Sequence, residues 1–365
     1  MILLNSSIGN YITSNGKRYS YFGGNNYLGL AAHPLVKEAA VKAIEKYGVN
    51  FSASRRTSGT ADIHMELEEK LAHFKGKQDS VVFASGYQGN SILLEVLRER
   101  YTHIFLDQYA HSSIHSAVKS SSARIHIYNH CDAGHLEHLM EEFSGSAPLI
   151  ITDGVFALTG EMAPLDKIYP LVKKHNAILI VDDAHATGVL GKNGRGTPEY
   201  FNLPENENIF QSETMSKALG SYGGFISAGR VFTDFLRETS SIYQASTSLP
   251  PSVVGAGIAA LAVINGNPEL RIRLIAKADD LRERIKELDF QTTSDRTPII
   301  PVMLNSIEKA KQFSLYLEEH GIIVPYMDYP SSHGSYMIRI AVSASHTEDQ
   351  IDELLEFMKK WRKIY

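Results

Sequence analysis

The chain has 365 residues, 43% of them hydrophobic and 21% charged, a composition typical of a globular protein with one large and one smaller domain. Its formal net charge of -5 argues against a protein that follows a nucleic-acid backbone. The single cysteine, Cys131, excludes a framework of intrachain disulfides and is typical of a reducing compartment.

The first 35 residues form an expected N-terminal segment rich in Gly, Asn, Tyr and Ser. The segment lacks the basic region of a secretion signal, and no apolar run in the chain is long enough to span a bilayer. We therefore expect a cytoplasmic protein without a membrane span. Asn25 lies in a Gly- and Asn-rich loop, where its amide could either form a turn or bind a ligand carboxylate.

Strands and helices alternate along the middle of the chain, after two amphipathic helices near residues 33–47 and 63–74. This alternation predicts a largely parallel sheet with helices on both faces, in a large α/β domain over residues 36–250. The remaining residues, 251–365, are expected to form a linking helix and a smaller α+β domain. The expected strands of the large domain cover residues 80–84, 102–106, 124–128, 148–152, 177–181 and 209–211.

Polar residues follow several of these strands, at the edge where ligands bind in parallel sheets. Asp182 comes directly after a strand of apolar residues, and it would be buried there unless it met a cation such as a pyridinium nitrogen. It could equally cap the next turn or pair with an arginine. His185 could meet a phenolic oxygen. His111 could stack on a ring or be a hydrogen-bonded loop histidine.

A short segment, Ser85–Asn90, lies between an expected strand and an expected helix. Its glycines, including Gly86, are compatible with a tight turn. They are also compatible with a phosphate-binding site, because a helix N-terminus offers unpaired N–H groups and a favourable dipole.

Lys217 lies among small residues, in the sequence Thr-Met-Ser-Lys-Ala-Leu-Gly, and its nearest charged neighbour is Glu213. Small neighbours allow a planar group to approach the backbone. A lysine that is partly desolvated and lacks counter-charges loses its proton more easily, as a lysine that forms a Schiff base requires. Locally this signal is weak.

The sequence His130-Cys131-Asp132, with His135 and His138, could form a metal site, since imidazole and thiolate are metal ligands. The spacing matches no common zinc pattern, and no second cluster completes it. We therefore expect no metal, and read these residues as the solvated start of a helix.

Taken together, the motifs resemble the α-oxoamine synthases, which are pyridoxal 5′-phosphate enzymes of fold type I with the aspartate-aminotransferase-like architecture. The resemblance runs nearly end to end. It is carried by the sequences at residues 25–30, 182–189, 191–196, 214–220, 246–251 and 339–343.

The resemblance implies a role for each of the matching residues. Lys217 corresponds to the Schiff-base lysine, Asp182 to the partner of the pyridinium nitrogen, and His185 to the contact with the phenolic oxygen. His111 corresponds to the residue stacked on the ring. The phosphate and ring-edge contacts correspond to Gly86, Tyr87 and Thr214, the phosphate contact from a neighbouring subunit to Ser246 or Thr247, and the carboxylate-binding groups to Asn25 and Arg339.

The implied activity is the decarboxylative condensation of a small amino acid with an acyl-CoA, in a homodimer with shared active sites. Within the family, residues 181–196 are most similar to the members that use alanine and a pimeloyl thioester in biotin synthesis. Residues 54–64 are also similar to members that use glycine or serine. A ligand-sensing protein of the same fold without catalytic activity is the alternative from another class.

Overall fold

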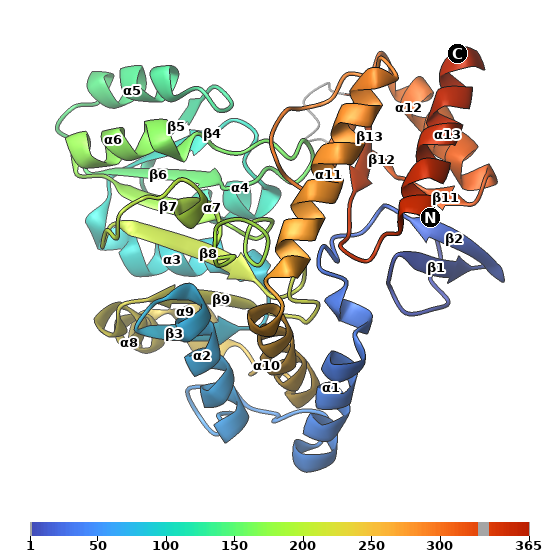
Figure 1. The fold of residues 1–365 in the computed structure, drawn as a ribbon. Coiled ribbons are helices and arrows are strands. Elements are labelled where there is room, and N and C mark those ends of the chain that lie inside the picture. The colour runs from blue at the N-terminus through green and yellow to red at the C-terminus, as the bar shows by residue number, and fades with distance from the viewer. Residues whose placement is uncertain (1, 328–335, 365) are drawn as a thin grey trace. The chain divides into compact units, whose positions relative to one another are not determined.

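The computed structural model describes residues 2–327 and 336–364, and the chain divides into two compact units (Figure 1). The larger unit contains residues 34–156 and 162–266, and the smaller unit contains residues 1–33, 157–161 and 267–365. The division into three parts at residues 35 and 250 stays a prediction.

A seven-stranded sheet with the order β3-β9-β8-β7-β6-β4-β5 forms the centre of the larger unit. All pairs from β5 to β8 are parallel, so the sheet is mostly parallel as expected. Strand β9 is antiparallel to both of its neighbours and was not expected. The strands are β3 (Asp79–Phe83), β4 (His103–Asp107), β5 (Arg124–Tyr128), β6 (Pro148–Asp153), β7 (Ile178–Asp182), β8 (Ile209–Thr214) and β9 (Gly224–Ala228).

Alternate residues of these strands point to opposite faces of the sheet, and each face has its own apolar core. Ile104 and Ile180 belong to the core formed with α3, α4, α8 and α9. Phe105 and Leu179, one position away on the same strands, belong to the core formed with α5 and α6. Figure 1 shows α5 and α6 together on one side of the sheet and α3 on the other. The central strands are therefore buried on both faces, as their continuous apolar sequences indicate.

Ten α-helices of the larger unit are described, and local sequence explains several of their ends. Asn176 adopts a left-handed conformation with φ 48° and ends α6, as Asn often does. The helices are α1 (Pro34–Tyr47), α2 (Asp62–Lys75), α3 (Gly89–Leu97), α4 (Ser112–Val118), α5 (Ala133–Glu142), α6 (Leu165–His175), α7 (Thr197–Tyr200), α8 (Arg230–Thr239), α9 (Ser241–Ala245) and α10 (Pro251–Gly266).

The smaller unit contains two three-stranded sheets, with the orders β1-β2-β11 and β10-β13-β12. Its strands are β1 (Tyr11–Ser14), β2 (Lys17–Tyr21), β10 (Ile299–Leu304), β11 (Ile322–Ile323), β12 (Tyr326–Met327) and β13 (Tyr336–Ala341). Its helices are α11 (Glu269–Glu287), α12 (Ile307–Glu319) and α13 (Glu348–Ile364). Across the described residues, no individual helix combines the length and hydropathy of a membrane span, although α10 and α11 pass that test if they are taken together.

His346 is buried in the smaller unit, and both of its ring nitrogens contact backbone groups of that unit. Its Nε2 lies 3.0 Å from the carbonyl oxygen of Tyr21, its Nδ1 accepts from the amide of Ser343 at 3.0 Å, and its ring stacks on Phe22. Burial lowers the pKa of His346 from 6.5 to about 4. The unfolded chain therefore binds a proton that the folded chain excludes, and the stability that neutral His346 contributes is lost as the pH falls from 6.5 to 4.

We expect His346→Gln to reduce the dependence of stability on pH in this range, by about 3 kcal/mol at most. The measurement is the free energy of unfolding by denaturant at pH 7 and at pH 4.5. The control is His320→Gln, since His320 is exposed at the end of α12. An equal loss of stability on acidification in the wild type and in His346→Gln would contradict the prediction.

Candidate functional site

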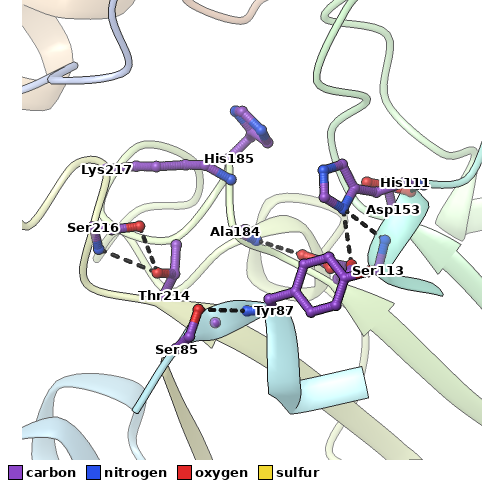
Figure 2. A pocket seen from close by; sticks show the side chains of 12 residues that line it. Ser85, Tyr87, His111, Ser113, Asp153, Ala184, His185, Thr214, Ser216 and Lys217 are labelled. Carbon is purple, nitrogen blue, oxygen red and sulfur yellow. Dashed lines mark hydrogen bonds between the residues drawn. The ribbon is translucent and has the colours of Figure 1, made fainter. Parts of the chain in front are cut away.

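A pocket with about 450 Å³ of empty space, open solvent at its mouth included, lies at the carboxyl ends of the central strands in the larger unit (Figure 2). The register of the sheet pairs Asp153 at the end of β6 with Asp182 at the end of β7, and Thr214 ends the neighbouring strand β8. The pocket is therefore at the edge where ligands bind in parallel sheets. It is lined by Ser85, Gly86, Tyr87, His111, Ser113, Asp153, Asp182, Ala184, His185, Thr214, Ser216 and Lys217.

The carboxylate of Asp182 is almost fully buried and is oriented by two donors. Oδ2 accepts a hydrogen bond from Nδ2 of Asn90 at 2.7 Å, and Oδ1 accepts from the amide of Ala184 at 3.2 Å. Asn90 lies in the first turn of α3, where it is also fully buried. The two donors hold Asp182 in one position at the pocket, and a carboxylate in a buried site needs a cation to balance its charge.

His111 is held at the N-terminus of α4 by contacts on both its backbone and its ring. Its amide donates to Oδ2 of Asp153 at 2.8 Å, and its Nδ1 lies 2.8 Å from Oγ of Ser113. Burial and the nearby carboxylate of Asp182 raise the pKa of Asp153 well above its usual value, and burial lowers the pKa of His111. A neutral, oriented imidazole is thus presented to the pocket, where Figure 2 shows it opposite Lys217.

Gly86 lies where the turn after β3 approaches two other strands closely. A Cβ atom at Gly86 would lie 2.7 Å from Cβ of Thr214, and one at Gly224 would lie 2.7 Å from Cα of Gly86. Ser85 accepts from the amide of Tyr87 at 3.3 Å, and the short 3-10 helix Gly86–Gln88 precedes α3. Backbone groups therefore line this side of the pocket, an arrangement suited to an anion.

Lys217 is carried by a compact loop between β8 and β9. The amide of Met215 donates to the carbonyl of Gly223 at 2.9 Å, and Oγ1 of Thr214 lies 2.8 Å from Oγ of Ser216. Gly223 has φ 104°, a conformation that favours glycine. Figure 2 shows the side chain of Lys217 extending across the pocket beside His185, so the loop presents an amine to the same space as Asp182 and His111.

Asp183, next to Asp182, points into the protein instead of the pocket. Its carboxylate accepts from Oγ1 of Thr197 at 2.6 Å, from the amide of Thr197 at 2.9 Å and from Nε2 of Gln211 at 2.6 Å. Burial raises the pKa of Asp183. The two adjacent aspartates therefore have different surroundings, one at the pocket and one inside a hydrogen-bonded network.

Two of the predicted site residues, Asn25 and Arg339, meet in the smaller unit. Nη2 of Arg339 donates to Oδ1 of Asn25 at 3.0 Å, and Nε donates to the carbonyl of Ala157 at 2.6 Å. Oδ1 of Asn25 also accepts from the hydroxyl of Tyr27 at 3.2 Å. The amide oxygen of Asn25 is thus occupied by donors, and its Nδ2 is the group with which it can bind an acceptor.

Two other predicted residues, Ser246 and Thr247, do not line this pocket. Oγ of Ser246 donates to the carbonyl of Ile242 at 2.6 Å, and Thr247 forms an isolated β-bridge with Ser54. Their expected role lies in a neighbouring subunit, so it stays a prediction.

Only some of the side chains that suggested a metal site, in residues 130–138, lie close together. Oδ1 of Asp132 accepts from the amide of His135 at 2.9 Å and caps α5, and Nδ1 of His135 accepts from the amide of Asn129 at 3.0 Å. His138 lies on the exposed face of α5. The expectation that this region holds no metal stays a prediction.

Three residues that position Asp182 or His111 were not assigned a role from the sequence. Asn90 orients Asp182, Ser113 contacts the ring of His111, and Asp153 binds the amide of His111. Asp153 follows an expected strand, so the sequence places it on the same rim as Asp182 without giving it a role. Asn90 lies in the segment considered as a phosphate site and Ser113 lies close to His111, but nothing in the sequence indicates the hydrogen bonds that they form.

Residues 20–358 match the aminotransferase class I and II family. A curated relative, 8-amino-7-oxononanoate synthase from Alkaliphilus metalliredigens, is 39% identical over 352 residues, which are 96% of this chain and 89% of the relative. Serine palmitoyltransferase from S. paucimobilis, solved with a bound PLP-myriocin aldimine, superposes with a TM-score of 0.95 at 29% identity and covers 100% of this chain and 92% of its own. The 8-amino-7-oxononanoate synthase of Francisella tularensis superposes with a TM-score of 0.80 at 29% identity, over 94% of this chain and 98% of its own.

Proposed function

The chain belongs to the aminotransferase class I and II family, with the fold of the type I pyridoxal-phosphate transferases, and we propose that it is an 8-amino-7-oxononanoate synthase. The proposed reaction condenses L-alanine with pimeloyl-CoA and releases CoA and carbon dioxide, as in biotin synthesis. The observation that carries the proposal is the pocket that brings Lys217, Asp182, His185 and His111 together.

The residues of the pocket fit pyridoxal 5′-phosphate. The buried carboxylate of Asp182 suits the protonated pyridine nitrogen, because it supplies the negative charge that such a cation requires in a desolvated site. The side chain of His111 offers a flat face to the ring. The backbone near Gly86, which a side chain would obstruct, suits the phosphate. Lys217 would hold the aldehyde carbon of the cofactor.

When it is bound there, pyridoxal phosphate supplies an electron sink for negative charge at Cα of the amino acid. Asp182 would favour the protonated form of the pyridine nitrogen, and Asn90 holds Asp182 in place. The amine of Lys217 would take the proton from Cα of the amino acid and later return one to the same carbon. His111 would pack against the ring of the cofactor, and His185 would contact its phenolic oxygen.

We propose that Asn25 and Arg339 bind the carboxylate of the amino acid, since an arginine fork suits a carboxylate and Nδ2 of Asn25 remains a donor. Arg339→Lys should raise the KM for the amino acid about 10- to 100-fold with a smaller effect on kcat, because a lysine cannot bind Ala157, Asn25 and the substrate in the same geometry. The measurement is steady-state kinetics with varied amino acid. Arg296→Lys, at an exposed position, is the control, and an unchanged KM in Arg339→Lys would contradict the assignment.

The test of the substrates is the release of CoA from a panel of thioesters with alanine, glycine or serine. Alanine with pimeloyl-CoA is expected to give the highest kcat/KM. The second candidate function is that of serine palmitoyltransferase, which the TM-score of 0.95 supports, or that of a glycine C-acetyltransferase. Turnover with serine and a long-chain acyl-CoA alone would favour a serine palmitoyltransferase. Turnover with glycine and acetyl-CoA alone would favour a glycine C-acetyltransferase. No release of CoA in any combination would favour a sensing protein.

We also propose a homodimer in the cytoplasm, with Ser246 or Thr247 of one subunit contacting the phosphate in the other. Support for the dimer comes from the sequence at residues 246–251, which resembles that of the dimeric family members. Sedimentation tests whether the protein is a dimer, and the cofactor affinity of a Thr247→Ala variant tests the contact with the phosphate.

A further inference from the structure

Outside the pocket, the side chains of Asp107, His130 and Cys131 lie together where β4 ends and α5 is about to begin. Across residues 2–327 and 336–364, these three form a group whose carboxylate, imidazole and thiol atoms lie within 4.8 Å of one another. Nδ1 of His130 is 2.9 Å from Oδ1 of Asp107, and Nε2 of the same ring is 3.6 Å from Sγ of Cys131. The imidazole therefore lies between the carboxylate and the thiol.

The contacts of Asp107 determine which ring nitrogen of His130 carries the proton. Oδ1 of Asp107 also accepts from the amide of Tyr109 at 2.8 Å, and Oδ2 accepts from the amide of Cys131 at 3.0 Å. A carboxylate surrounded by N–H donors accepts from Nδ1–H of the imidazole as well. The lone pair of Nε2 is then directed toward Sγ of Cys131. Because the oxygens of Asp107 already accept these bonds, an oriented base beside a nucleophile describes the group better than a metal site.

Neighbouring aromatic rings fix this geometry. The ring of Tyr109 stacks on His130 with a centroid distance of 4.5 Å, and Phe156 meets the imidazole edge-on at 4.3 Å. Cys131 has φ 54° and is partly exposed, and its Sγ also lies 3.7 Å from the carbonyl oxygen of Met162. The thiol is thus held beside a base, in a residue that packs against the core of α5 and α6 and keeps part of its surface exposed.

We propose that Cys131 is a nucleophilic thiol, activated by His130, that forms mixed disulfides with small disulfide molecules. In this step Sγ transfers its proton to Nε2 of His130 and attacks one sulfur of the disulfide. One S–S bond forms as the other breaks, and the second sulfur leaves as a thiolate that takes the proton from the imidazolium. The small disulfide that Sγ attacks is the oxidant, and an added thiol reverses the step. None of the three side chains lines the pocket, so the proposal is independent of the proposed function.

The test is the second-order rate constant for mixed-disulfide formation with bis(hydroxyethyl) disulfide, an uncharged probe, followed by intact mass spectrometry. Because the chain has one cysteine, the added mass reports Cys131 alone. We expect the native protein to react at least about tenfold faster at pH 7 than the same chain in guanidinium chloride. We expect His130→Gln to lose this acceleration. His138→Gln, which removes an exposed imidazole from α5, should react like the wild type.

A native protein that reacts no faster than the unfolded chain would overturn the proposal, and this comparison needs no variant to fold. A folded His130→Gln variant that reacts as fast as the wild type would overturn the role of His130. Thermal unfolding of each variant establishes whether it is folded before its rate is compared.

Discussion

Replacing Lys217 by alanine is expected to lower kcat by at least about 10³-fold, because the variant loses both the covalent link to the cofactor and the base that moves the Cα proton. The cofactor should still bind, since Asp182, His111 and the backbone near Gly86 remain in place. The measurements are turnover and, after borohydride reduction, peptide mass spectrometry. Reduction fixes the cofactor to the lysine that holds it, and this label should lie on Lys217 in the wild type and on no lysine in the variant.

The matched control for this prediction is Lys192→Ala, which removes an exposed lysine of the larger unit that does not line the pocket. Its turnover and its reduced label should be those of the wild type. A label that remained covalent in Lys217→Ala, or turnover within tenfold of the wild type, would show that another residue holds the cofactor.

Asp182→Asn should mainly lower kcat and Asp183→Asn should mainly lower stability, although the two residues are adjacent. Asp182→Asn is expected to lower kcat by roughly 10²-fold or more, because an amide carries no charge to keep the pyridine nitrogen protonated. Its stability should change less, since Oδ1 of an asparagine can still accept from the amide of Ala184, and its Nδ2 can donate to Oδ1 of Asn90 once the amide of Asn90 turns over. The measurements are kcat at saturating cofactor and the free energy of unfolding.

Asp183→Asn should instead lower the free energy of unfolding by about 1–3 kcal/mol. An amide nitrogen placed there would face the donors on Thr197 or Gln211, and the surroundings leave no room to turn away, since a Cβ at Gly196 would lie 1.8 Å from Oδ2 of Asp183. The kcat of folded Asp183→Asn should be closer to the wild-type value than the kcat of Asp182→Asn. Equal losses of kcat in both variants would mean that the pocket does not separate the two carboxylates as described.

Most strands of the larger unit could be predicted from the sequence because they are short, largely apolar runs separated by amphipathic helices. Strand β9 could not, since Gly224–Ala228 follows a glycine-rich loop and its antiparallel pairing with β3 joins segments far apart in the sequence. The same holds for β11, whose two residues are a strand only because they pair with β2. Such pairings depend on tertiary contacts that local patterns do not encode.

The candidate site was predictable to the extent that its residues follow strands. Asp182 and His111 are placed by the sheet, so a correct assignment of strands places them too. Asn90 acts through a hydrogen bond across 92 positions, and Arg339 meets Asn25 across 314 positions. For Arg339 only the resemblance to a family indicated a role, because nothing around it in the sequence distinguishes it from any other arginine in a strand.

The close approach of Gly86, Gly224 and Thr214 has a consequence for the range of substrates. At Gly86 the space that a Cβ would need is taken by Cβ and Oγ1 of Thr214, and at Gly224 it is taken by the ring of Phe83 and the backbone of Gly86. Any side chain at position 86 or 224 would therefore displace these neighbours and change this part of the pocket. We therefore expect the range of substrates to change through substitutions at positions other than 86 and 224.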